Sequence, residues 1–148
     1  MKLKIEISNE CKEEEIIIRC NNVNDTVQKI QAYIQTLVTP KLTFYKGTQE
    51  FYLSLDEIIF FETENEQVYA HTKNDAFRVK YRLYELEKML SNTFIRVAKG
   101  TIVNTSHIYA INRNITGASQ ILFNATHKHI YASRHYYNDL KQTIKGRV

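Results

Sequence analysis

Glycine is scarce in this sequence, with only four glycines in 148 residues. So few glycines do not supply a glycine-rich loop that cradles phosphate, and neither G-x-G-x-x-G nor a P-loop is present. The nucleophile motif G-x-S-x-G and the zinc motif H-E-x-x-H are also missing. We therefore predict a protein that is not an enzyme, needs no cofactor and takes no small-molecule substrate.

Cysteine and long hydrophobic runs are scarce as well. Cys11 and Cys20 are the two cysteines, and they form no metal-binding or redox motif. No apolar run approaches the ~18 residues of a membrane-spanning helix. The first residues, MKLKIEIS, alternate apolar and charged side chains as a strand does, unlike a signal peptide. These features favour a cytoplasmic protein with reduced thiols.

Acidic residues are nearly absent from the C-terminal part of the chain. Residues 1–90 contain 12 Lys and Arg against 15 Asp and Glu, whereas residues 91–148 contain 8 against Asp139 alone. A basic region of this kind is the electrostatic signature of a polyanion-binding surface, although a basic surface without a partner gives the same pattern.

Two clusters have the residue types of a metal or acid–base site. Glu62, Glu64 and Glu66 alternate along the chain, which is more typical of a solvated strand end than of a catalytic row. His127 and His129 share one strand face, but a zinc site needs three or four ligands and no third is evident. The ten tyrosines are compatible with an RNA-binding sheet, yet no RNP-like motif supports one. We predict no metal site.

The first 39 residues have the pattern of a small β-β-α extension. Residues 2–8 alternate, and residues 16–20 form a second short β-favouring run. From Asp25, the predicted cap, apolar side chains recur at helical spacing along one face. Pro40, the only proline, closes this segment. We place the domain boundary there, with an extension over residues 1–39 and a second domain over residues 40–148.

From Lys41 onward, short β-favouring runs alternate with turn residues. Residues 58–63 are largely apolar, which suits a strand at the centre of a sheet. One helix is predicted over residues 82–90 and a last one after Ser133, which can cap it. Strands this closely spaced, without long intervening helices, exclude a doubly wound fold. The expected class is mainly β (α+β), with about ten short strands.

Four segments of this region resemble the motifs of one family. FIRVAKGTIVN, residues 94–104, is similar to the segment F-[IF]-R-V-[HS]-[RK]-S-x-I-V-N of LytTR DNA-binding domains. Residues 58–62 resemble the family's strand I-x-Y-I-E, and residues 83–90 its helix L-x-E-L-E-x-x-L. Residues 133–141 resemble its ending, S-R-R-Y-x-x-x-L-K. The four motifs occur in the family's order, and the resemblance covers roughly residues 41–145.

The resemblance implies an elongated antiparallel β domain rather than a helix-turn-helix. It implies a transcriptional regulator that inserts loop side chains into the major groove of double-stranded DNA at direct-repeat promoter elements, with two copies on the DNA. Many LytTR regulators carry a receiver domain at the N-terminal end, and 39 residues are too few for one. The chain is therefore similar to stand-alone LytTR regulators.

A second hypothesis is a protein-interaction module that couples a membrane or cytosolic partner to regulation. The stand-alone relatives are thought to work alongside membrane proteins, and the acidic first 90 residues are suited to binding a partner. Both hypotheses hold together if the extension serves partner binding or self-association. Salt dependence separates them, because DNA binding through several phosphates weakens steeply with salt.

The family's strongest base-reading position falls on Lys99. A lysine at the tip of this turn can donate to guanine O6 and N7. Ala98 stands where many members have His or Ser, and Gly100 stands where they have Ser, so two hydrogen-bonding side chains are missing beside it. The alternative interpretation is a solvated lysine at a hairpin turn.

The other base-reading positions lie in two further segments. Arg134 matches the first arginine of the family's ending, and His135 replaces the second, which gives a weaker and pH-sensitive contact. Glu66 and Gln67 match the family's other recognition loop. Gln67 is suited to adenine, while Glu66 repels phosphate unless it accepts from cytosine N4.

Phosphate contacts position a protein on DNA without reading sequence. Each candidate also has a purely structural interpretation. Arg96 is able to pair with an acid across the sheet, Arg78 and Lys80 are compatible with an ordinary solvated strand face, and basic residues near a helix C-terminus are favoured there anyway. The predicted phosphate-contacting residues are Arg96, Arg78, Lys80, Arg82, Lys141 and Lys145.

Overall fold

The computed structural model describes residues 1–146. The chain divides into two units, Met1–Val38 and Thr39–Val148. We call the first unit the extension and the second unit the domain, and each is described by itself.

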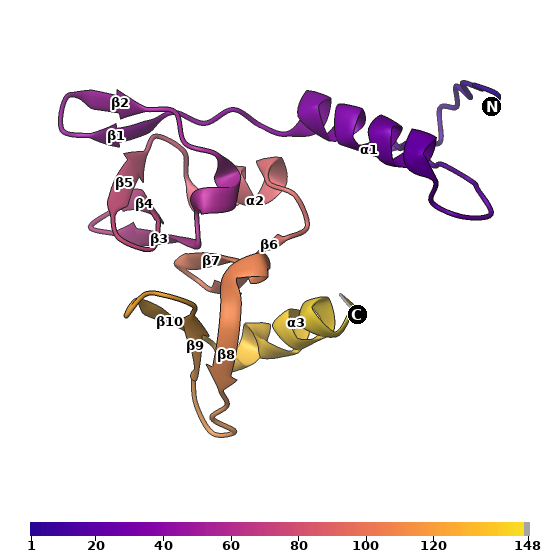
Figure 1. The fold of residues 1–148 in the computed structure, drawn as a ribbon. Coiled ribbons are helices and arrows are strands. Elements are labelled where there is room, and N and C mark those ends of the chain that lie inside the picture. Colours follow the sequence, from indigo (N-terminus) through magenta and orange to yellow (C-terminus); the bar gives the residue numbers. More distant parts are fainter. Residues whose placement is uncertain (147–148) are drawn as a thin grey trace. The chain divides into compact units, whose positions relative to one another are not determined.

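The extension contains the helix α1 (Asp25–Val38) (Figure 1). Asn24 caps this helix, because its Oδ1 accepts a hydrogen bond from the backbone N–H of Val27 at 3.0 Å. The prediction of Asp25 as the cap is wrong by one residue, since Asp25 is already the first helical residue. An asparagine at this position satisfies a backbone donor that the first turn leaves unpaired.

The strands predicted over residues 2–8 and 16–20 are not formed. Residues 1–24 are all described, and none of them lies in a strand. A strand is held by a ladder of hydrogen bonds to a neighbouring strand. Between backbone groups of residues 1–23 there is a single hydrogen bond, from the N–H of Cys11 to the carbonyl oxygen of Ser8 at 3.3 Å. The alternating pattern is present, but the partner strand is not.

The domain is built on a seven-stranded antiparallel sheet in the order β2-β1-β5-β4-β3-β7-β6 (Figure 1). Neighbouring β-strands of this sheet are joined mainly by tight turns. The strands are β1 (Phe44–Lys46), β2 (Gln49–Phe51), β3 (Phe60–Glu64), β4 (Gln67–His71), β5 (Ala76–Val79), β6 (Phe94–Ala98) and β7 (Thr101–Asn104).

A second, three-stranded antiparallel sheet has the order β10-β9-β8. Its strands are β8 (Ile108–Asn112), β9 (Ser119–Phe123) and β10 (His129–Ala132). Helix α2 (Leu83–Met89) contacts β3, β6 and β7, and helix α3 (Arg134–Lys145) contacts β6. Two short 3-10 helices, Leu55–Glu57 and Thr105–His107, complete the described elements of the domain.

Strand β3 lies between β4 and β7 and contributes to two hydrophobic cores. Successive side chains of a strand point to opposite faces. Phe61 therefore packs in one core with Leu86 of α2, and Phe60 packs in the other with Ile121 of β9 and Leu140 of α3. The prediction of an apolar strand at the sheet centre is confirmed, as is the mainly β class with antiparallel sheets.

Candidate nucleic-acid interface

The β3–β4 turn and the β6–β7 turn lie next to each other at one end of the large sheet. Strands β3 and β7 pair antiparallel, with Glu62 opposite Thr101. Beyond that pair, the N–H of Thr63 donates to the carbonyl oxygen of Gly100 at 2.9 Å. Two of the three predicted base-reading segments are thus joined by backbone hydrogen bonds.

The β3–β4 turn is a two-residue hairpin loop. Asn65 and Glu66 have φ angles of 51° and 65°, and Glu64 is paired with Gln67. Both central residues are in the left-handed region, as tight hairpin turns require, which asparagine tolerates better than glutamate. The side chains of Glu66 and Gln67 are exposed. The Tyr69 hydroxyl donates to Gln67 Oε1 at 3.1 Å, so the tyrosine orients the amide of this glutamine.

The β6–β7 turn presents Lys99 as an exposed side chain. The Arg96 guanidinium stabilises the turn with two hydrogen bonds to its backbone. Nε donates to the carbonyl oxygen of Ala98 at 3.3 Å, and Nη2 donates to the carbonyl oxygen of Lys99. The Nη1 of Arg96 also pairs with Glu87 Oε2 at 3.1 Å, which links the turn to helix α2. Arg96 therefore does pair with an acid, but that acid lies in helix α2 and not across the sheet as the structural interpretation had it.

The third segment is the start of α3, and it is joined to β6. The N–H of Ser133 donates to the carbonyl oxygen of Val97 at 2.8 Å. Arg134 and His135 follow in the first turn of α3 with exposed side chains. Ser133 occupies the predicted cap position, but its buried hydroxyl makes no hydrogen bond within the described residues.

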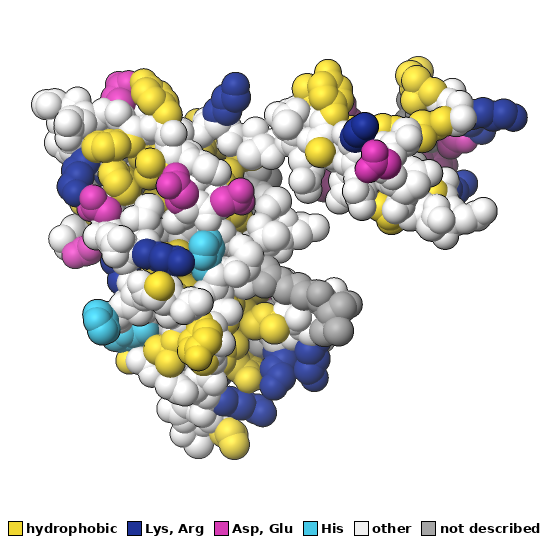
Figure 2. Space-filling view, viewed as in Figure 1, with side chains coloured by type: hydrophobic (Ala, Val, Ile, Leu, Met, Phe, Trp, Pro, Cys, Tyr) yellow, Lys and Arg dark blue, Asp and Glu magenta, His cyan; other side chains and the backbone are white. Residues whose placement is uncertain are grey.

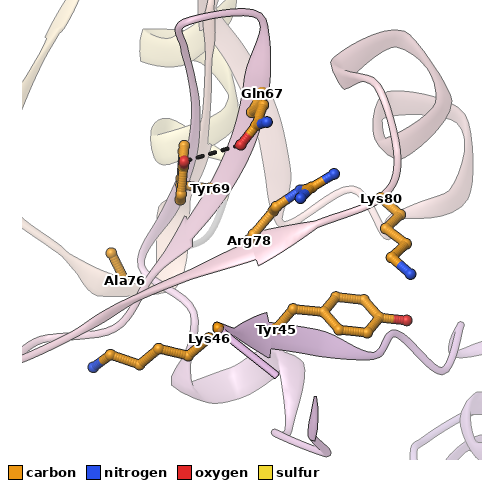
Figure 3. Close-up of a pocket in the computed structure, with 8 residues that line it drawn as sticks. Tyr45, Lys46, Gln67, Tyr69, Ala76, Arg78 and Lys80 are labelled. Carbon is orange, nitrogen blue, oxygen red and sulfur yellow. Dashed lines mark hydrogen bonds between the residues drawn. The ribbon is translucent and has the colours of Figure 1, made fainter. Parts of the chain in front are cut away.

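A basic hollow lies on the β1-β5-β4 face of the large sheet (Figure 3). Arg78 projects into it between Gln67 and Lys80. The Lys80 ammonium lies 4.3 Å from the centre of the Tyr45 ring, and that of Lys46 lies 2.5 Å from Asp75 Oδ1. Within residues 1–146, the Arg78 guanidinium has neither a hydrogen bond nor an ion pair, so it is available to an anion.

A second basic hollow lies between β8 and α3 and is lined in part by Arg113, Tyr137, Lys141 and Lys145. The guanidinium of Arg113 lies 5.2 Å from the centre of the Tyr137 ring, and the Lys141 ammonium lies 5.9 Å from it. Figure 2 shows Lys and Arg side chains gathered in this part of the domain. The sequence-based prediction included the two lysines and missed Arg113, because that residue belongs to no family motif.

Arg82 stands apart from both hollows, at the start of α2. Its side chain is exposed, and its backbone N–H donates to Glu85 Oε1 at 3.1 Å. This helix is thus capped from within, and the Arg82 guanidinium is not needed for the cap.

A partly buried polar cluster fixes the base of the β4–β5 turn. The Lys128 ammonium donates to the carbonyl oxygens of Thr72 and Asp75 at 2.9 and 2.5 Å, and it lies 3.2 Å from His71 Nδ1. Because an ammonium only donates, Nδ1 accepts and the imidazole proton is assigned to Nε2. Nε2 lies 3.0 Å from Glu62 Oε1, but within the described residues it makes no hydrogen bond of normal geometry. Burial, and next the Lys128 charge, lower the pKa of His71 to about 4.

Glu62, the first of the three alternating glutamates, belongs to the same cluster. Burial, and then the neighbouring Glu64 charge, raise the pKa of Glu62 above its ordinary value. Glu62 lies beside the imidazole of His71, with about a third of its side chain exposed: the exposed fraction is 34%. Among residues 1–146, no group of three or more His, Cys, Asp or Glu side chains is arranged to hold a metal ion.

Residues 49–145, well over half of the chain, match the family of LytTr DNA-binding domains. The chain belongs to the LytTR family. It is a DNA-binding transcriptional regulator of this family and not an enzyme. The four motifs that suggested the resemblance all lie within the matched range.

Relatives of the LytTR regulator match it over nearly its whole length. An uncharacterized HTH-type transcriptional regulator of Staphylococcus aureus strain NCTC 8325 is 32% identical over 145 residues, which is 97% of this chain and 98% of that protein. Counterparts in strains COL and MSSA476 give the same values. In this LytTR domain α2 and α3 are separated by β6 to β10, so the two are not a helix-turn-helix pair.

A LytTr DNA-binding domain from Bacillus cereus has the same fold. The TM-score is 0.65 at 20% identity, and the match covers 71% of this chain and 97% of that domain. Within residues 1–146 of the LytTR regulator, no helix combines the length and the apolar content needed to cross a bilayer.

Proposed function

We propose that the LytTR domain reads direct-repeat promoter DNA through side chains of the β3–β4 turn, the β6–β7 turn and the start of α3, inserted into the major groove. The observation that carries this proposal is the pair of backbone hydrogen bonds, Thr63 to Gly100 and Ser133 to Val97. They join three segments that are distant in sequence. Base readout needs side chains held in fixed register, and backbone hydrogen bonds provide it.

In this proposal five exposed side chains read bases. Lys99 donates to guanine O6 and N7, Arg134 reads guanine, and His135 contributes a weaker contact. Gln67 reads adenine with its amide, which Tyr69 orients, and Glu66 accepts from cytosine N4.

Phosphate contacts position the domain on the duplex. Arg78 is the best supported of them, because its guanidinium has no partner among residues 1–146 and lies in the basic hollow beside Lys80. Arg96 already uses three of its five N–H groups inside the protein, which leaves two for a phosphate. Lys141 and Lys145, with the newly found Arg113, form a separate basic group, and Arg82 adds an isolated contact.

Two copies bind the two elements of a direct repeat in this proposal, and the regulator acts in the cytoplasm. A membrane-protein partner is the alternative use of the residues outside the DNA-binding site. Salt separates the two interactions, since releasing counterions from several phosphates makes DNA binding strongly salt-dependent.

Fluorescence anisotropy on the duplex upstream of the protein's own gene, against a scrambled duplex at two salt concentrations, tests the proposal. Lys99→Ala is expected to reduce the preference for the target by about 1–3 kcal/mol, because a bidentate base contact is lost. Lys141→Ala is expected to weaken binding to both duplexes equally and to reduce the salt slope by about 1.

Lys29→Ala is the matched control, because this exposed lysine lies in α1 and outside the domain. It should leave both affinities unchanged. A Lys99→Ala variant that keeps the full target preference would remove Lys99 from the base-reading set and with it the central assignment.

A further inference from the structure

The extension exposes an unusual number of large apolar side chains. Ile5 is 80% and Ile7 95% exposed, and yellow hydrophobic side chains are visible on the surface of this unit (Figure 2). Only Val27 of the extension is buried. The exposed set is Met1, Leu3, Ile5, Ile7, Ile16, Ile17, Ile18, Val23, Tyr33, Leu37 and Val38. Eleven exposed large apolar side chains within 38 residues are more typical of an interaction surface than of a free one.

The backbone of the extension is equally unpartnered. Residues 2–8 alternate apolar and charged side chains, and residues 16–20 are β-favouring, yet neither segment is part of a ladder. Unpaired N–H and C=O groups in such segments are a template for pairing with another chain. The segments thus carry both the apolar face and the hydrogen-bonding edge of a sheet that the single chain does not form.

We propose that residues 1–38 are a dimerisation element that pairs with the same residues of a second copy of this chain. The proposal deepens the proposed function, on which it rests, because it names the surface that brings two copies to a direct repeat. In this dimer the two-fold axis relates the two extensions only, while the two domains, which are separate units of their chains, follow the direct repeat. The edges of residues 2–8 and 16–20 pair across the interface, and the apolar faces of these segments and of α1 become buried.

The charges of the extension suit a copy of itself. It contains five Lys and Arg against six Asp and Glu, so two extensions do not repel each other strongly. The opposite charges lie in different segments: Lys2 and Lys4 in the first, and Glu13, Glu14 and Glu15 just before the second. A two-fold axis brings the first segment of one copy against the second segment of the other. The acidic run also disfavours an anionic lipid surface as the occupant.

The size of the extension also fits. A standard protein–protein interface involves about 20–30 residues on each side, and the extension provides 38. The match to the Staphylococcus aureus regulators covers 97% of this chain and therefore includes most of the extension, whereas the match to the Bacillus cereus domain covers 71%. Most of the extension therefore accompanies the domain in the Staphylococcus aureus regulators as well.

Analytical ultracentrifugation of the full chain tests the proposal. The unaltered protein is expected to reach about twice the 17.4 kDa monomer mass as its concentration rises. In an Ile5→Asp, Ile17→Asp double variant, the dissociation constant of the dimer is expected to rise at least about thirtyfold, the effect of losing one interface hot spot. Ile115→Asp is the matched control, because Ile115 is 75% exposed but lies in the domain. It should dimerise like the unaltered protein.

Binding to a duplex with one repeat element separates this proposal from the proposed function. The double variant should bind a single element as tightly as the unaltered protein and lose only the gain on the tandem repeat. An unaltered chain that stays monomeric at every concentration, or a double variant that dimerises normally, would overturn the dimerisation element. An unaltered protein that does not bind a single repeat element would instead contradict the proposed function.

Discussion

The extension and the domain both contain β-favouring segments, but only those of the domain become buried strands. Phe61 in β3 is fully buried, whereas Ile5 in the extension is 80% exposed. The difference lies in the neighbours: β3 pairs with β4 and β7, while residues 2–8 have no partner strand among residues 1–146 of their own chain. An apolar or alternating pattern specifies the face that becomes buried, but a strand forms only where a partner supplies the ladder.

The largest expected effect comes from removing a buried side chain of the domain. Phe61→Ala should lower the free energy of unfolding by about 3–5 kcal/mol, since it deletes a ring at the centre of a packed core and leaves a cavity. Urea unfolding followed by tyrosine fluorescence measures this, because nine of the ten tyrosines lie in the domain and the chain has no tryptophan.

Ile5→Ala is the counterpart in the extension. Its side chain is exposed in the single chain, so the unfolding of the domain should change by less than about 0.5 kcal/mol at concentrations where the protein is monomeric. A large loss of domain stability in this variant would mean that Ile5 packs on the domain in solution, and the contrast between the two units would fail.

Two asparagines sharpen the comparison at an intermediate size of effect. Asn104 is buried in the domain, where its Nδ2 donates to the carbonyl oxygen of Ile58 at 2.9 Å and its Oδ1 accepts from the N–H of Ser106 at 3.1 Å. Asn104→Ala leaves a buried carbonyl without its donor, and it should cost about 1–3 kcal/mol of domain stability.

Asn24→Ala removes the cap of α1 in the extension. A lost cap costs a helix about 1 kcal/mol. Here the loss should appear as lower helix content in far-ultraviolet circular dichroism, with the urea midpoint of the tyrosine signal unchanged. Equal shifts of that midpoint in both asparagine variants would show that the extension and the domain unfold as one unit.

Much of the domain could be predicted from the sequence because its signals are local. The apolar run of β3, the turn at Glu64–Glu66 and the helix pattern of α2 each depend on adjacent residues and are formed as expected. The strands of the extension failed for the opposite reason, since the pattern of residues 2–8 is local but the ladder is not.

The candidate site divides in the same way. Lys99 and Gln67 were predicted from turns and motifs that are continuous in sequence. Arg113 and Lys128 were missed, because their settings are assembled from β8 with α3, and from the β9–β10 turn with the β4–β5 turn. No spacing rule connects such segments. Arg96 has a predictable partner type, but its two bonds to the β6–β7 turn occur at a register shift between Arg96 and Ala98 that no motif indicates.

The smallest expected effect concerns pH, and it too separates the two units, since all five histidines lie in the domain. The pKa of His71 is lowered to about 4 from an ordinary value near 6.5, so the unfolded chain takes up a proton through pH 6.5 that the folded chain resists until about pH 4. The stability that the neutral His71 contributes is complete above pH 6.5, and it is lost as the pH falls from 6.5 to about 4. Glu62 acts in the opposite direction, because its pKa is raised in the folded chain.

Between pH 7 and pH 5 the free energy of unfolding should fall by about 1 kcal/mol, after allowance for the partial access of water to the imidazole. Urea midpoints between pH 7 and pH 5 measure it, with His71→Gln expected to flatten the dependence and His127→Gln, at an exposed position, to leave it as in the unaltered protein. The slope, not the absolute stability, is the readout, because the substitution also removes the stacking of His71 on Phe60. An unchanged slope in His71→Gln would mean that folding does not lower the pKa of His71, which would contradict a neutral imidazole that accepts from the Lys128 ammonium.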